Sequence, residues 1–441
     1  MHNVLDPRDV IADEYAQREE SGYDVAALRG ALEAALADGP GAALEALLAQ
    51  LEAAPRVDSW PYHEPSDLPG ILASLRQPAP LDPLGYGDDE LYDRILAAWL
   101  GRCAGCNLGK PFEGVTREQI RAYLTAAAAY PLDDYVPVLD PMPEGIALNP
   151  SWTETTRGRI AFMARDDDTD YTILALHILE VHGFDYTAED VAREWLSRLP
   201  FLQVYTAERA AYRNLVLGVP ASDAARVRNP WREWIGAQIR ADMFGYVSPG
   251  QPLRAARLAF ADASLSHVAN GIYGAMWAAG LIAACFSAGS ARQALDAAAA
   301  VVPPRSRLTE ALALVDAMHA EGLDWETARD RLETELGALS WVHTINNAAL
   351  VAMALLWGDG DFTATIGLAV QGGWDTDCNG ATAGSAFGAL HGSAALPRRW
   401  VEPLNDRIRS ALFGYEDSRV SDLAGRTHAL ARAQMSAPAE I

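Results

Sequence analysis

The sequence predicts an all-α protein, with one compact helical domain that follows a helical extension. Two observations support this fold class. Alanine and leucine dominate the chain, and apolar residues recur at helical spacing in segments such as 29–54, "RGALEAALADGPGAALEALLAQLEAA". Stretches in which β-branched and polar residues alternate, as they do in a half-buried strand, are almost missing.

The first 80 residues predict the helical extension. Within 29–54 a Gly-Pro pair should separate two helices, and the extension ends in the proline-rich "RQPAPLDPLGYGDD" (76–89). We expect residues 1–80 to serve in packing or dimerisation rather than in a second activity. The main domain is predicted over 88–415, and residues 416–441, which end in "SAPAEI", are predicted to form a C-terminal tail.

Two segments of the main domain stand out before its polar motifs. Residues 89–114, "DELYDRILAAWLGRCAGCNLGKPFEG", predict a helix with small residues on one face that stops at Pro111. Residues 129–152 contain five prolines and few helix signals, so they predict a long loop. Such a loop is either a functional lid or cleft wall, or a surface insertion, and both interpretations stay open.

Composition excludes several classes of protein. The net charge of −24 argues against a nucleic-acid partner, because binding of the phosphate backbone needs basic surface. No segment has the length and apolarity of a membrane span, and the first residues do not have the pattern of a secretory signal. Four cysteines in 441 residues do not make a disulfide framework, so we expect a cytoplasmic protein. Lys110 is the sole lysine, a bias that we attribute to genomic composition rather than to function.

The segment "ARDDDTDYT" (164–172) places three consecutive aspartates at the start of an apolar helix that should continue through Leu179. Aspartate is a good N-cap, and the helix dipole favours negative charge there. A cap needs one such side chain, so capping does not account for Asp166, Asp167 and Asp168 together. Their mutual repulsion predicts a counter-charge, and a bound cation is the simplest one.

A second cluster lies in "QGGWDTDCNGATAGSAFGALHG" (371–392), where Asp375 and Asp377 precede a segment rich in small residues. Small residues let two helices approach closely, so the two aspartate clusters are expected to face each other across one pocket. Ligands that offer only oxygen suit Mg²⁺ or Mn²⁺ rather than zinc. With four or five carboxylates, a site for two metal ions is feasible.

Other candidate residues favour a structural interpretation. For His343 and Asn346, in "WVHTINNAAL", core packing is preferred over a role in a site. Cys103 and Cys106 form a CxxC pair on a predicted helix without a second pair, so a metal or redox role is not favoured. The "GDGD" at 358–361 lacks the ligand spacing of a calcium loop and is predicted to be a turn.

Three ordered motifs, "RILAAWLGRCAGCNLGKPFEG" (94–114), "DDDTDYTILAL" (166–176) and "GGWDTDCNGATAGSAFGAL" (372–390), resemble those of the ADP-ribosylglycohydrolase family. Between them, "PGQPLRAARLAFADASLSH" (249–267) is similar to the family's middle segment, which ends in histidine. The likeness spans roughly 90–395 and leaves the extension outside. It implies an all-α, magnesium-dependent hydrolase that cleaves at the anomeric carbon of a ribosyl or ADP-ribosyl group.

The resemblance also assigns residues to roles. It implies two Mg²⁺ ions, with Mn²⁺ as the alternative. It places five aspartates in the metal site: Asp166, Asp167, Asp168, Asp375 and Asp377. It implies catalytic roles for Glu113, Asp168 and Asp375, and substrate contacts for Trp374, His267 and Cys378. For His267 alone, a buried structural histidine is the preferred interpretation of the residue itself.

This chain departs from the family's pattern at three positions. Asp166 replaces a threonine or serine, Cys378 replaces a threonine that would suit a hard ion better, and Trp374 replaces a glycine. The expected substrate is a small ribosylated metabolite or an ADP-ribosylated protein. The rival hypothesis is a non-catalytic ligand-binding or structural protein that kept the fold.

Overall fold

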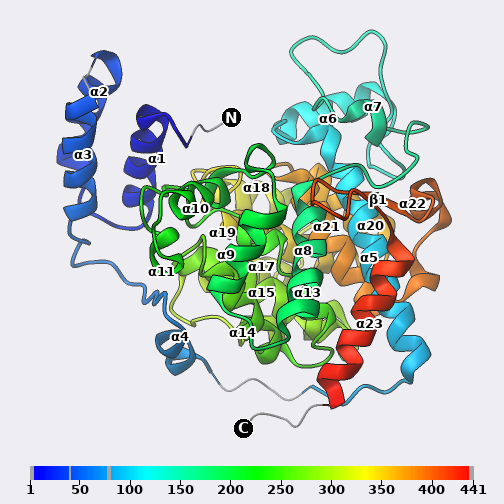
Figure 1. Ribbon diagram of the computed structural model, residues 1–441. Helices are drawn as coiled ribbons and strands as arrows, with labels where there is room; N and C mark the ends of the chain where they lie inside the picture. The colour runs from blue at the N-terminus through cyan, green and yellow to red at the C-terminus, as the bar shows by residue number, and fades with distance from the viewer. Residues whose placement is uncertain (1–3, 39–40, 77–80, 437–441) are drawn as a thin grey trace.

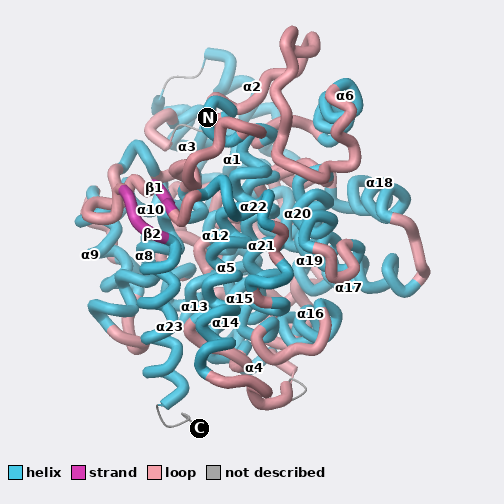
Figure 2. Tube along the Cα trace, turned by 90° about the vertical axis from the view of Figure 1, so that its right-hand side faces the viewer, coloured by secondary structure: helices cyan, strands magenta, loops and turns pink. Residues whose placement is uncertain are grey.

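The computed structural model describes residues 4–38, 41–76 and 81–436, and over these residues the protein is built of helices (Figure 1). The sheet found there is a single antiparallel pair, β1 (Arg407–Arg409) and β2 (Asp417–Arg419), seen beside α8 in Figure 2. The predicted all-α fold is therefore confirmed. No helix of the described part is long and apolar enough to cross a membrane.

The extension consists of short helices at the edge of the molecule (Figure 1). They are α1 (Pro7–Glu20), the 3₁₀ turn η1 (Ala26–Leu28), α2 (Arg29–Asp38), α3 (Gly41–Ala53) and α4 (Leu68–Ser74). The helices predicted on either side of the Gly-Pro pair are α2 and α3, while the pair itself, residues 39–40, lies outside the described residues. A small apolar core, which includes Ile11, Tyr15, Leu44 and Leu51, joins α1 to α3.

The body contains the other helices and short turns. Its α-helices are α5 (Asp88–Gly109), α6 (Arg117–Ala126), α7 (Trp152–Thr155), α8 (Asp167–His182), α9 (Ala188–Arg198), α10 (Thr206–Val216), α11 (Ala221–Ala224), α12 (Gly236–Ile239), α13 (Asp242–Tyr246), α14 (Pro252–Ala263), α15 (Ala269–Cys285), α16 (Ala291–Ala299), α17 (Arg307–Ala320), α18 (Trp325–Leu336), α19 (Thr344–Trp357), α20 (Phe362–Gln371), α21 (Thr376–His391), α22 (Arg398–Val401) and α23 (Val420–Ser436). Its 3₁₀ turns are η2 (Lys110–Phe112), η3 (Phe201–Gln203), η4 (Ser393–Ala395) and η5 (Glu402–Leu404). Helix α15 is buried along its whole length and lies at the centre of the body.

Helices α5 and α21 run antiparallel in direct backbone contact. A Cβ atom added to Gly105 would lie 1.9 Å from the carbonyl oxygen of Gly380, and one added to Gly101 would lie 2.1 Å from that of Gly384. These glycines recur every four residues, so they form one continuous face on each helix. The contact continues to the end of α5, where the hydroxyl of Thr376 donates to the carbonyl oxygen of Gly109 at 2.8 Å.

The extension is held to the body by buried polar contacts along α1. The indole of Trp231 donates to Asp13 at 2.7 Å, and Arg232 forms an ion pair with Glu14. Both Gln17 and Ser21 donate to one carboxylate oxygen of Glu233 at 2.9 Å. Such contacts, buried and charge-assisted, fix α1 on the segment 231–233. This docking agrees with the packing role predicted for the extension.

The end of the chain corrects one prediction. Residues 416–441 are not a tail, because they contain β2 and the 17-residue α23, which packs against α5. The hydroxyl of Thr427 on α23 accepts a hydrogen bond from the indole of the buried Trp99 on α5 at 3.1 Å. Apolar residues at helical spacing, from Val420 to Ala431, form the buried face of α23. The last residues, 437–441, lie outside the described part.

The proline-rich segment 129–152 is a long loop, as predicted. Tyr135 and Val136 of this loop are buried in an apolar cluster with Trp400, and the backbone N–H of Leu132 donates to Gln371 at 2.8 Å. One part of the loop therefore packs on the body, while its tip, residues 140–147, is mostly exposed at the surface.

The glycine contact can be tested by replacing Gly105 with alanine. The new methyl group would meet backbone rather than a movable side chain, so α5 and α21 must separate. We expect a loss of roughly 1–3 kcal/mol of stability, measured as a lower midpoint of thermal unfolding. Gly425→Ala on α23 is the matched control, because nothing lies within 4 Å of its added Cβ. Equal midpoints for the two variants would contradict the role of the contact.

Candidate active site

Three consecutive aspartates at the start of α8 have three different surroundings. Asp166 is the N-cap, and one of its oxygens accepts the backbone N–H of Asp168 at 2.9 Å. The carboxylate of Asp168 turns inward to the buried guanidinium of Arg102, at 3.3 Å. Asp167 is half-buried and lines the cavity described below. Asp166 thus caps the helix, Asp168 pairs with Arg102, and Asp167 faces the cavity.

The start of α21 brings the second aspartate cluster to the same place. Asp375 and Asp377 are buried on either side of Thr376, which is hydrogen-bonded to the end of α5. The side-chain oxygen of Asn347 on α19 accepts the backbone N–H of Asp375 at 3.2 Å and the amide of Asn379 at 2.7 Å. Helices α5 and α19 together therefore fix the first turn of α21.

The end of α5 supplies the third part of the site. Lys110, in η2 directly after α5, is buried and forms an ion pair with Asp166. Glu113 follows, and one of its oxygens accepts the side-chain amide of Asn149 at 2.8 Å. Since Asn149 belongs to the proline-rich loop, this contact connects the loop to the site and supports the predicted cleft wall.

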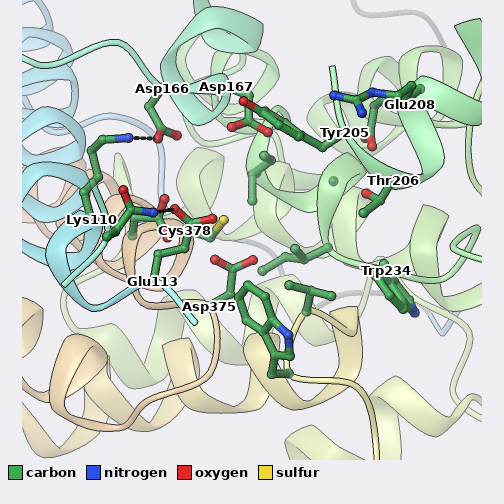
Figure 3. A pocket seen from close by; sticks show the side chains of 18 of the residues that line it. Lys110, Glu113, Asp166, Asp167, Tyr205, Thr206, Glu208, Trp234, Asp375 and Cys378 are labelled. Carbon is green, nitrogen blue, oxygen red and sulfur yellow. Dashed lines mark hydrogen bonds and ion pairs between the residues drawn. The ribbon is translucent and has the colours of Figure 1, made fainter. Parts of the chain in front are cut away.

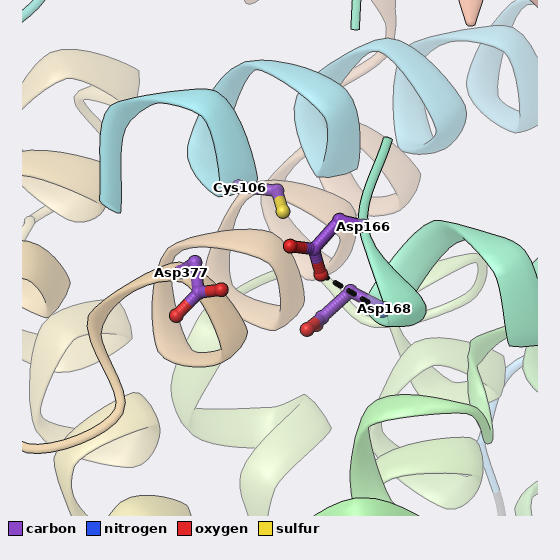
Figure 4. A group of neighbouring side chains, drawn as sticks. All are labelled: Cys106, Asp166, Asp168 and Asp377. Carbon is purple, nitrogen blue, oxygen red and sulfur yellow. Dashed lines mark hydrogen bonds between the residues drawn. The ribbon is translucent and has the colours of Figure 1, made fainter. Parts of the chain in front are cut away.

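The side chains from α5, α8 and α21 form two groups with the spacing of metal ligands. Ligand atoms of Cys106, Asp166, Asp168 and Asp377 all lie within 4.8 Å of one another (Figure 4). The same holds for Asp375, Asp377 and Cys378, so Asp377 belongs to both groups. The two aspartate clusters, about 200 residues apart in the sequence, do face each other as predicted. Their roles as ligands remain predictions.

The carboxylates lie close together, and their pKa values are shifted in opposite directions. Burial would raise the pKa of Asp166, but the ammonium of Lys110 outweighs it and lowers this pKa to about 2. Burial, followed by the charge of Asp166, raises the pKa of Asp167 to about 8 and that of Asp377 to about 6. The charge of Asp377, followed by burial, raises the pKa of Glu113 to about 9. Without a further cation, Asp167 and Glu113 therefore tend to hold protons at neutral pH, whereas Asp377 is mostly ionised.

A cavity of about 370 Å³ opens beside the cluster (Figure 3). Its volume lies in the range of small-molecule sites, roughly 300–1,000 Å³. The acidic residues that line it are Glu113, Asp166, Asp167, Glu208, Asp375 and Asp377, the basic ones are Lys110, Arg165 and Arg209, and the aromatic ones are Tyr205, Trp234 and Trp341. The cavity is therefore lined by both acidic and aromatic side chains.

Two residues predicted to contact substrate do not line this cavity. Trp374 has a φ of +60°, and its ring packs on the guanidinium of Arg329 at 3.9 Å from the ring centroid. His267 is buried, with Nδ1 at 2.8 Å from the hydroxyl of Ser266, and burial lowers its pKa well below the usual value. Cys378, the third such residue, does line the cavity, and its thiol donates to Asp168 at 3.2 Å.

Of the residues given a structural interpretation, three are confirmed in it. His343 is the buried N-cap of α19, and Asn346 donates to the carbonyl oxygen of Ser340 at 3.0 Å. Cys103 is buried in the apolar core. Cys106 is different, because its thiol lies close to the aspartates. Cys106 and Lys110 are four residues apart, and this helical spacing could have predicted that both lie on one face.

Residues that the sequence did not single out complete the site. Lys110, attributed above to composition, is an ion-pair partner of Asp166. The aromatic residues Tyr205, Trp234 and Trp341 come from segments without a recognisable motif. Only the three-dimensional arrangement brings them to one cavity.

The donors present fit a hard divalent cation. One carboxylate oxygen of Asp377, Oδ1, is buried and has no hydrogen-bond partner. A buried carboxylate oxygen without a partner is costly, and a cation is the partner that such oxygens bind best. Asp375, close to it in the same group, adds a second oxygen ligand.

Comparisons with known proteins identify the family of the chain. No curated protein matches the sequence. A solved structure described as "ADP-ribosylglycohydrolase-related protein complex" is similar over 78% of this chain and 99% of its own, at 20% identity and a TM-score of 0.49. The family model described as ADP-ribosylglycohydrolase matches residues 87–436, beyond the end predicted for the main domain and without the extension. The chain belongs to the ADP-ribosylglycohydrolase family.

Proposed function

We propose that this protein is a metal-dependent hydrolase that cleaves the glycosidic bond at the anomeric carbon of a ribosyl or ADP-ribosyl group. The observation that carries the proposal is the buried, unpartnered oxygen of Asp377 at the floor of a cavity of small-molecule size. Family membership supplies the reaction type, and the carboxylates supply the groups that such a reaction needs.

The metal ion is proposed to be Mg²⁺, with Mn²⁺ as the alternative, held by Asp375 and Asp377. When bound, such an ion binds ribose hydroxyls and makes a coordinated water more acidic. Asp167, which lines the cavity and is half-buried, is placed to form hydrogen bonds with the sugar.

Glu113 is proposed to act on the attacking water. Its position is fixed by Asn149, and its second oxygen is left for another donor. The charge of Asp377 keeps Glu113 protonated when no cation is present, so neutralisation of Asp377 would release Glu113 as a carboxylate that accepts a proton from water. The geometry thus couples ion binding to the state of the catalytic base.

The cavity favours an uncharged ribosyl compound over one that carries a pyrophosphate. Its basic side chains already have partners: Lys110 pairs with Asp166, Arg165 pairs with Asp170, and Arg209 donates to backbone carbonyl oxygens. Six acidic residues line the cavity against these three. A small ribosylated metabolite is therefore the proposed substrate, with an ADP-ribosylated protein as the alternative.

Asp377→Asn tests the proposal. Loss of a metal ligand should remove the rise in melting temperature caused by Mg²⁺ and lower hydrolysis by about 100-fold or more. Hydrolysis is measured by mass spectrometry on N-ribosyl and O-ribosyl compounds, each with and without the ADP group. Asp330→Asn, which changes an exposed aspartate on α18, is the control and should behave as wild type. If wild-type protein binds ribosyl compounds but releases no ribose or ADP-ribose with any metal, the binding-protein hypothesis prevails.

The shifted pKa values predict how the stability of the metal-free protein changes with pH. A carboxyl whose pKa is raised on folding stabilises the protein below its unfolded pKa and loses this effect as pH rises through the folded value. Asp377, Asp167 and Glu113, with pKa values of about 6, 8 and 9, should therefore make the metal-free protein less stable from about pH 5 to pH 9. Asp166, whose pKa is lowered to about 2, stabilises the protein fully above about pH 4 and loses this effect as pH falls toward 2.

Thermal unfolding at several pH values, with EDTA or with Mg²⁺, measures this effect. The stabilisation by Mg²⁺ should grow as pH rises, because the ion binds the ionised carboxylates. In the metal-free protein, Asp167→Asn should reduce the loss of stability that occurs as pH rises. Parallel pH profiles with and without the ion would contradict the assignment.

A further inference from the structure

Lys110 occupies a position where the family resemblance leads one to expect a metal ion. Its ammonium group is paired with one oxygen of Asp166, and both side chains are more than nine-tenths buried. The other oxygen of Asp166 accepts the backbone N–H of Asp168. Both oxygens of this predicted metal ligand are therefore already bound by donors of the protein.

Asp168, the next predicted ligand of the same group, is engaged in the same way. One of its oxygens lies 3.3 Å from Arg102, and the other accepts the thiol of Cys378 at 3.2 Å. Arg102 is itself fixed, because it also pairs with the buried Asp242 at 2.8 Å. Besides Asp377, which both groups share, the first group contains Cys106, whose soft sulfur suits neither Mg²⁺ nor Mn²⁺.

The second group, Asp375, Asp377 and Cys378, differs because it contains a carboxylate oxygen without a hydrogen-bond partner. Asp377 has a buried oxygen without a partner, and no arginine or lysine is in ion-pair contact with Asp375 or Asp377 in the described part of the chain. Asp166 and Asp168 thus have ion-pair partners within the protein, while Asp375 and Asp377 have none among the described residues.

We propose that the centre takes a single divalent cation, on Asp375 and Asp377, and that the ammonium group of Lys110 serves as the second, resident cation on Asp166. The inference rests on the proposed function, and it replaces the two ions that the family resemblance implies with one. It explains why a lysine and an additional aspartate occur together: Asp166, in place of a hydroxyl residue, gives Lys110 a partner of opposite charge.

The backbone keeps Lys110 at this position. Lys110 follows Gly109, whose carbonyl oxygen is held by Thr376 of α21, so the lysine and the metal-binding aspartates are joined by one hydrogen bond. A flexible surface lysine could move away from its partner, whereas a buried one in η2 has no aqueous alternative. The ammonium group is therefore a fixed part of the centre.

The number of bound ions tests the proposal directly. Purified metal-free protein is titrated with Mn²⁺ by calorimetry, and electron paramagnetic resonance then shows whether the bound ion is isolated or coupled to a second one. Wild type and Lys110→Arg should bind one isolated ion per chain. Lys110→Ala removes the charge and opens space at Asp166, so it should bind two, with the signal of a coupled pair.

Each outcome decides the matter. Two ions in wild type would overturn the inference and leave the proposed function intact. No ion in wild type would overturn the proposed function and the inference with it. One ion in both wild type and Lys110→Ala would show that Lys110 does not exclude the second ion, which also overturns the inference.

A second readout is independent of variants and of their folding. Because Lys110 is the sole lysine, ¹⁵N-lysine labelling gives the wild-type protein one side-chain NMR signal. On addition of one equivalent of Mg²⁺ this signal should shift once and remain that of a protonated, slowly exchanging ammonium group. A signal that is lost or becomes solvent-exchanging as metal binds would show displacement of Lys110 by the ion and would overturn the inference.

Discussion

The backbone contact between α5 and α21 is the constraint on which the candidate site depends. Glycine at every fourth position lets the two helices touch without side chains between them, and their antiparallel direction brings the end of α5 to the start of α21. Lys110 and Glu113 follow the first helix, and Asp375 precedes the second. With larger residues at this contact, Lys110 and Glu113 would be separated from the aspartates of α21 by the width of a side chain.

The second constraint is the charge that this contact concentrates. Buried carboxylates are costly unless each has a partner of opposite charge or a proton. The protein supplies Arg102 for Asp168 and Lys110 for Asp166, but it leaves Asp377 without such a partner. The folded chain without metal therefore retains protons that it would otherwise lose at neutral pH. The proposed ion would replace these protons, so the proposed activity and the local stability would depend on the same event.

Sequence patterns predicted the parts of the fold and site that depend on local chemistry. The helical periodicity, the break between α2 and α3, and the approach of the two aspartate clusters all follow from residue type and spacing. The direction of a side chain does not. Trp374 lies beside Asp375 in the sequence, yet its left-handed backbone turns the ring toward Arg329. Lys110 was uninformative until the fold placed it on Asp166, and α23 was missed although its apolar spacing is helical.

The docking of α1 has a consequence for how this protein can evolve. Trp234, which lines the cavity, directly follows the segment in which Trp231, Arg232 and Glu233 are each bound by a residue of α1. The extension lies outside the part of the chain matched by the family, yet it binds the segment next to a residue that lines the cavity. Natural variation at the cavity wall is thus constrained from outside the matched region. A lineage that exchanged its extension would alter the shape of the wall without a single change in the matched region.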